Sequence, residues 1–155
     1  MIPDIAQLRS LRWRMTRVLL WFSIGSIVGG TAIVLLSQEG WADAIGWQFA
    51  IWGGIDLVFA LMGVRQCSRA KQGLLDDLAE AESLRKSLRF NGGLNWLWVT
   101  LGTVLIAWGA ATASTTLVGH GIGVLLQGGF LFFFDRLFLR KLSRLLDPPG
   151  QLERV

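Results

Sequence analysis

Residues 117–139 read LVGHGIGVLLQGGFLFFFDRLFL, and this stretch decides how the rest of the sequence is interpreted. It carries one Asp and one Arg in 23 residues, and about 20 mostly apolar residues suffice for a helix to cross a bilayer. Three other stretches have a similar length and character: 18–36, 44–64 and 94–113. The sequence therefore predicts an all-α membrane protein in which four transmembrane helices form two hairpins.

The overall composition agrees with this class. Charged residues make up 17% of the 155, against about 25% in ordinary soluble domains. A chain of this length has room for one domain, so we expect a single four-helix bundle over residues 1–155. The stretch 18–36 is longer than the apolar part of a signal peptide, which runs about 7 to 15 residues, and is expected to be a retained span.

The basic residues predict the orientation. All 15 Lys and Arg lie before the first span, between the second and third, or at the end of the fourth and beyond. Loops 37–43 and 114–116 contain none. Under the positive-inside rule both termini face the cytoplasm, which indicates a multi-pass protein of the cell inner membrane. This orientation and the anionic lipid of the inner leaflet explain the net charge of +4, so the bilayer and not a nucleic acid is the expected partner.

Residues 74–90, between the hairpins, are predicted to form a short cytoplasmic amphipathic helix. Apolar residues recur there at helical spacing, and the acidic residues precede the basic ones, as the helix dipole favours. The break Asn91-Gly92-Gly93 is expected to turn the chain into the bilayer. The helix either docks on the bundle or binds a partner.

A weak internal repeat relates the two hairpins at an offset of 75 residues. Matched pairs include Trp21 and Trp96, Gly53 and Gly128, and Arg69 and Arg144. The pattern indicates either a duplicated hairpin, with parallel copies, or the general likeness of two apolar hairpins with basic ends. Both interpretations predict that the first span pairs with the second, and the third with the fourth.

Small residues at four-residue spacing predict where helices touch. In lipid, helices associate by close packing at small side chains. Such faces occur at Gly25 and Gly29, and at Gly46, Ala50 and Gly54.

Asp56 and Gln127 are the polar residues expected nearest the middle of the membrane. A charged Asp at that depth costs a few kcal/mol, so Asp56 should be partnered or protonated. Because buried polar groups in lipid are satisfied internally, we expect the two side chains to meet, directly or through water, between the second and fourth spans. The contact either fixes the packing of these helices or binds a proton or a small solute.

Four other polar or aromatic residues are singled out by depth. Trp52 is the Trp placed to line a site in the core, and Asn95 opens the third span at the cytoplasmic edge. His120 lies near the outer end of its span, either facing headgroups or acting as a ligand. Asp135 is interpreted as an interfacial charge pair with its neighbour Arg136.

No enzyme motif is apparent. One His and one Cys do not supply the three or four ligands that a metal site needs at defined spacing, so no metal site is expected. The glycine-rich stretches lack the Lys-Ser/Thr ending of a phosphate loop, and no Gly-x-Ser-x-Gly elbow occurs. We therefore expect no catalytic residues and no enzymatic activity.

Three motifs together carry a resemblance. They are Trp52-Gly53-Gly54-Ile55-Asp56, Asn91-Gly92-Gly93-Leu94-Asn95, and the stretch from His120 through Gln127 to Asp135. Over the second to fourth spans the sequence resembles an uncharacterised bacterial family of small four-helix integral membrane proteins. The resemblance implies a bacterial inner-membrane protein and transfers no catalytic residues.

Three functions remain open at this point. The preferred one is a non-catalytic accessory or assembly subunit, acting as a homodimer or in a larger membrane complex. The second is a module that binds or transports a small solute or a proton, with Asp56 and Gln127 as its site. The third is a pigment- or haem-binding protein in which His120 holds a porphyrin, and the cofactor is otherwise unknown.

The orientation can be tested by cysteine labelling of intact cells. Ser37→Cys and Thr115→Cys, placed in the two loops without basic residues, should react with a membrane-impermeant thiol reagent. The native Cys67 should react only after the membrane is opened, and its labelling in intact cells would reverse the predicted topology.

Overall fold

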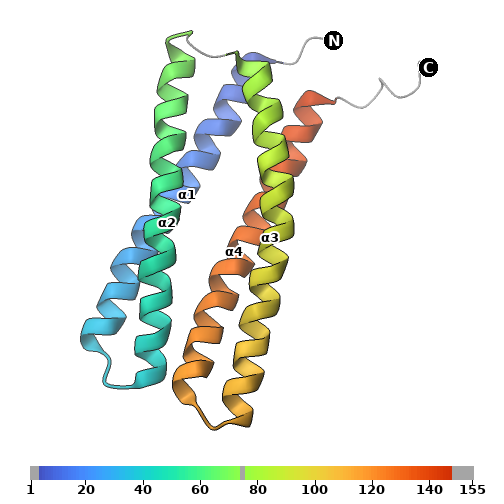
Figure 1. The fold of residues 1–155 in the computed structure, drawn as a ribbon. Helices are drawn as coiled ribbons and strands as arrows, with labels where there is room; N and C mark the ends of the chain where they lie inside the picture. The colour runs from blue at the N-terminus through green and yellow to red at the C-terminus, as the bar shows by residue number, and fades with distance from the viewer. Residues whose placement is uncertain (1–3, 74–75, 148–155) are drawn as a thin grey trace, which may run out of the picture.

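The computed structural model describes residues 4–73 and 76–147, which form four helices. These are α1 (Ile5–Leu36), α2 (Gly40–Lys71), α3 (Asp77–Ala111) and α4 (Thr115–Leu146). They form two antiparallel hairpins, α1 with α2 and α3 with α4, which stand side by side with the chain termini at one end (Figure 1). The predicted pairing of first with second span and third with fourth is confirmed.

Local capping explains where three of the helices begin. Asp4 accepts hydrogen bonds from the backbone of Ala6 and Gln7, and Asp76 does the same for Leu78 and Ala79. Ser114 accepts one from Leu117 at the start of α4. These side chains satisfy N–H groups that the first turn of a helix leaves unpaired.

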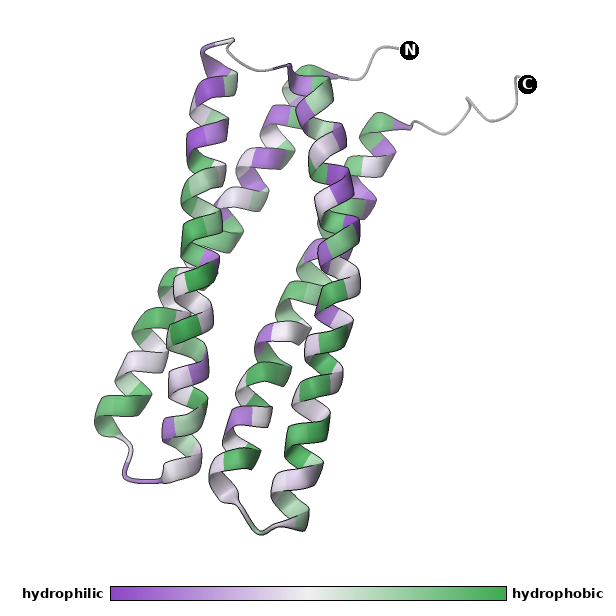
Figure 2. Cartoon of the chain, viewed as in Figure 1, coloured by the Kyte–Doolittle hydropathy of each residue, from purple (hydrophilic) through white to green (hydrophobic). Residues whose placement is uncertain are grey.

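The helices are longer than the predicted spans. A helix of 32 residues, such as α1, α2 or α4, is about 48 Å long at 1.5 Å per residue, whereas the hydrocarbon core of a bilayer is about 30 Å thick. All four are long and apolar enough to cross a membrane. Hydrophilic residues are most frequent towards the end that carries the termini, and the loop between α1 and α2 at the other end is hydrophilic as well (Figure 2).

The predicted break between a cytoplasmic helix and the third span is wrong. From Asp77 onwards residues 77–90 form the first turns of α3, and Asn91-Gly92-Gly93 lie inside it; residues 74–75 lie outside the described part of the chain. A glycine within a helix costs only about 1 kcal/mol, and continuing the helix keeps its backbone hydrogen-bonded. The helix therefore continues through Asn91-Gly92-Gly93, although these residues favour a turn locally.

Glycines set the contact within each hairpin. A Cβ on Gly30 would lie 2.6 Å from the Gly46 carbonyl oxygen, and one on Gly102 would lie 2.7 Å from the Leu125 nitrogen. These backbones are thus too close for any larger residue at either position. The prediction was right for Gly46, but Gly25, Gly29 and Gly54 make no close contact within the described chain, because a Cβ built on any of them would meet no atom of another segment within 4 Å.

The two hairpins meet mainly along α2 and α4, which run parallel. A Cβ on Gly119 would overlap the backbone of Trp41, and one on Gly123 would lie 2.6 Å from the Gln48 Cβ. Gln48 and Gly123 are 75 positions apart, the offset of the sequence repeat. Residues that the repeat matches on α2 and α4 therefore lie at about the same height along the bundle.

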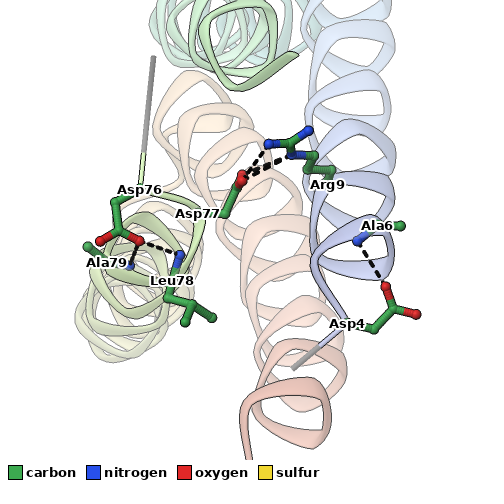
Figure 3. A network of polar contacts seen from close by, with 7 residues as sticks. All are labelled: Asp4, Ala6, Arg9, Asp76, Asp77, Leu78 and Ala79. Carbon is green, nitrogen blue, oxygen red and sulfur yellow. Dashed lines mark hydrogen bonds and ion pairs between the residues drawn. The ribbon is translucent and has the colours of Figure 1, made fainter. Parts of the chain in front are cut away.

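A cluster of buried apolar side chains lies towards the end that carries the termini. Its members come from α1, α3 and α4: Leu8, Ala81, Leu88, Phe134, Phe138 and Leu142. The apolar stripe predicted over 74–90 is thus buried at Ala81 and Leu88. At the same end, Arg9 of α1 donates hydrogen bonds to both carboxylate oxygens of Asp77, in the first turn of α3 (Figure 3). This contact joins α1 to α3. The hydrogen bond to Asp77 raises the pKa of Arg9, which keeps it charged.

Adjacent glycines in α2 offer a matched test of this packing. Gly53→Ala should destabilise the fold by about 1–3 kcal/mol because its Cβ would lie 2.8 Å from the Ser26 Cβ. Gly54→Ala meets no atom within 4 Å and should be neutral or slightly stabilising, because Ala favours the helix. Thermal unfolding in detergent measures both, and equal effects would contradict the packing described.

Candidate functional site

The candidate site lies in the interface between α2 and α4. Gly119 and Gly123 pack directly on α2, and Gln127 continues the same face of α4 one turn further. On α2, the face that packs on α4 includes Gln48 and continues at four-residue steps through Trp52 to Asp56. The tight contact at the glycines therefore directs the two predicted polar residues into one interface.

Asp56 and Gln127 are both buried there with polar atoms that have no partner. Their exposed fractions are 5% and 2%. Within the described residues, Oδ2 of Asp56 and both Nε2 and Oε1 of Gln127 make no hydrogen bond. The two side chains, which were expected to meet directly or through water, form no direct hydrogen bond, and both are buried where α2 and α4 meet.

Asp135 and Asn95 form a second buried polar pair one to two turns towards the termini. Asn95 Nδ2 donates to Asp135 Oδ2 over 2.7 Å, and each residue is 5% exposed. Asp135 was interpreted as a charge pair with Arg136, and this is wrong: Arg136 is exposed and lies over the Phe132 ring, 5.3 Å from its centroid. Successive residues of a helix point about 100° apart, so Asp135 turns inwards while Arg136 turns outwards.

Asp56 of α2 and Asp135 of α4 are both buried, each with an exposed fraction of 5%. By the offset of 75 residues, Asp56 is level with a point on α4 between Gln127 and Asp135. Asp56 and Gln127 of the α2–α4 interface and the Asn95–Asp135 pair between α3 and α4 therefore occupy neighbouring turns of the bundle.

Ser23 of α1 is buried at about the same height along the bundle as Asp56. Ser26 packs on Gly53 and Thr16 on Gly63, so Ser23 comes level with Asp56. Ser23 has an exposed fraction of 0% and donates its hydroxyl hydrogen to the Leu19 carbonyl oxygen. Sequence reasoning did not single out Ser23, because a Ser that bonds its own helix shows no distinct pattern.

Towards the hairpin loops, His120 and Trp52 share one polar partner. Gln48 Nε2 lies 3.0 Å from His120 Nδ1, and Trp52 Nε1 donates to Gln48 Oε1 over 2.9 Å. The Trp52 ring meets Trp98 of α3 edge to face, at 4.9 Å between centroids. Gln48 was missed by sequence reasoning, although its place four residues before Trp52 was the available signal.

The donor set favours a proton or a small polar ligand. Among residues 4–73 and 76–147, no group of three or more His, Cys, Asp or Glu is placed to hold a metal ion. A carboxyl can take up or release a proton, and a carboxamide offers both a donor and an acceptor. The unpaired atoms of Asp56 and Gln127 thus suit a proton, a small cation or a small hydrogen-bonding solute.

Comparison with known proteins places the chain in a family. Residues 18–136, more than half of the chain, match a family of unknown function (DUF6992). The chain belongs to that family. The matched region contains every residue of the α2–α4 interface described above. No curated protein and no solved structure matches the chain.

The buried amide pair predicts a specific stability effect. Asn95→Leu should destabilise the fold by about 1–3 kcal/mol, because it leaves the buried Asp135 carboxyl without its donor. Asn91→Leu, at an exposed position one turn earlier in α3, should change stability by less than about 0.5 kcal/mol. Denaturation in detergent monitored by circular dichroism compares them, and matching losses would rule out the pair as a stabilising contact.

Proposed function

We propose that the chain is a multi-pass protein of the bacterial inner membrane with both termini in the cytoplasm. Four helices of sufficient length and apolarity support the membrane location. Hydrophilic residues gather at the end of the bundle that carries the termini. The two hairpin loops at the opposite end contain no Lys or Arg, which supports the orientation. On this placement Asp56 and Gln127 lie near the middle of the membrane.

We further propose that the protein is non-catalytic and binds a proton or a small solute between α2 and α4. The observation that carries this proposal is the burial of three unpaired polar atoms on Asp56 and Gln127. A buried polar group without a partner costs about 1–3 kcal/mol, and more in lipid, where no water competes. Two such residues in one interface are explained by a ligand that uses them.

Neighbouring groups extend this site along the bundle. Asn95 and Asp135 lie on its cytoplasmic side, and Gln48 with His120 lies on its outer side. Polar and ionisable groups buried at several depths of a membrane protein mark pathways for protons, ions or substrates. A purely structural role would require only paired polar groups, as at Asn95 and Asp135.

An accessory or assembly subunit is the second candidate, and one observation favours it. Gly25 and Gly29 are exposed on α1, and a Cβ built on either would meet no atom of another segment of the described chain within 4 Å. Small residues at this spacing allow another transmembrane helix to approach closely. The surface fits a homodimer or a larger membrane complex, and both roles are compatible within one protein.

The core site can be tested with two substitutions at one position. Asp56→Asn keeps size and hydrogen-bonding capacity but removes the titratable proton, so the fold should persist while proton uptake is lost. Infrared difference spectra across a pH step should lose the carbonyl band of the protonated Asp56 carboxyl. Proteoliposomes loaded with a pH-sensitive dye should lose any proton flux that depends on the protein.

Controls separate this outcome from misfolding. Asp147→Asn, at an exposed carboxyl at the end of α4, should leave the infrared change and the flux intact. Gln127→Leu should weaken proton uptake while Asp56 is still present. An unchanged carboxyl band in Asp56→Asn would refute the core site and leave the accessory role as the proposal.

A further inference from the structure

An open groove runs between α1 and α4 on the side of the bundle away from α2 and α3. Its volume is about 860 Å³. The lining residues that define it here are Arg14, Arg17, Trp21, Phe130, Phe133 and Lys141. The groove is thus lined by both basic and aromatic side chains. Neither Asp56 nor Gln127 lines it.

One end of the groove is basic. Arg14 and Arg17 of α1 and Lys141 of α4 are all exposed. None of the three pairs with an acidic residue in the described part of the chain, whereas Arg9, Arg12 and Arg85 all do. Three positive charges therefore converge from two helices without a counter-charge of the protein's own.

The other end of the groove is aromatic. Trp21 is 66% exposed and Phe133 is 73% exposed. Phe130 stacks on Phe22 with ring centroids 3.5 Å apart, which closes the floor where α1 and α4 touch. From Phe130 to Lys141 the groove follows twelve residues of α4, a rise of about 16 Å at 1.5 Å per residue. That length matches one leaflet of the hydrocarbon core, about 15 Å.

We propose that this groove binds one anionic phospholipid of the inner leaflet. Its phosphate lies among Arg14, Arg17 and Lys141, and an acyl chain lies along Trp21 and Phe133. Charge complementarity supports the headgroup, because each Lys or Arg near an anionic surface contributes to binding. The inference rests on the membrane placement proposed above, and it assigns the groove a lipid, independently of what the core site binds.

A second copy of the chain fits this groove less well. In a symmetric dimer the same patch meets itself, so two sets of three unpaired cations would face each other. Like charges brought together without counter-charges repel. A phospholipid supplies the negative charge and the apolar chain at the spacing the groove presents.

The bound lipid also has a structural consequence. The hairpins join mainly through α2 and α4, and α1 meets α4 less extensively, in part through the apolar cluster near the termini. A lipid in the groove would bridge α1 of one hairpin and α4 of the other. The protein with this lipid should therefore unfold at a higher temperature than the protein in detergent alone, because ligand binding to the folded state stabilises it.

Native mass spectrometry of the full chain tests the proposal. After release from detergent with equal amounts of phosphatidylglycerol and phosphatidylcholine, the protein should retain one phosphatidylglycerol, at least about tenfold over phosphatidylcholine. The combined change of Arg14→Gln, Arg17→Gln and Lys141→Gln should abolish this preference. The control, Arg65→Gln, Arg69→Gln and Lys86→Gln, removes the same charge from exposed positions outside the groove and should keep it.

Several outcomes would overturn the lipid site. They are equal retention of both lipids, an unchanged preference in the groove variant, displacement of the lipid by inorganic phosphate, and a dimer whose formation blocks the groove. If the triple variant does not fold, Lys141→Glu alone should reduce the preference. Failure of the core site would instead appear as an unchanged infrared band, and failure of the membrane placement as wild-type protein that does not enter vesicles.

Discussion

Direct backbone contact between helices is the constraint on which the other features of this structure depend. Gly30 against Gly46 holds α1 on α2, and Gly102 against Leu125 holds α3 on α4. At these points any side chain would collide with the partner's main chain, so the helices can approach only in one register. Gly119 then seats the second hairpin on the first. Once these contacts are made, the direction of every other side chain along the four helices follows.

The two ends of the bundle are stabilised differently. Towards the termini, apolar side chains such as Leu8, Leu88 and Phe138 form a buried cluster of the kind that water drives together. Along the apolar spans, small residues make the contacts instead. On the proposed membrane placement this difference has a simple reason: lipid is as apolar as Leu, so helices in it gain by close packing and not by burial.

In the described part of the chain, Asp56 and Gln127 together leave three buried polar atoms unpaired, whereas Arg12 and Asp43 leave one each. Most polar groups of the interior have partners, as Asn95 has in Asp135 and Gln48 has in His120. An unpaired buried carboxyl and carboxamide lower stability, and functional sites are where such costs are usual. The proposed proton or solute site and the proposed lipid groove lie on different faces of α4, so the two can be altered separately.

From the printed residues alone, the all-helical class, the four long apolar helices and the pairing of the hairpins could be derived, because the length and apolarity of a segment are properties of that segment alone. The burial of Asp56 and Gln127 also followed from their depth. The continuity of α3 through Gly92 and Gly93 could not be derived from the sequence. A glycine pair ends a helix only where continuing the helix adds no stabilising contacts or hydrogen bonds. Which glycines touch, that Gln48 joins His120 to Trp52, and that Asp135 turns inwards to Asn95 depend on the rotation of one helix against another. The rotation of each helix is set by steric contacts with side chains of several other helices at once, so it cannot be read from any single segment of the sequence.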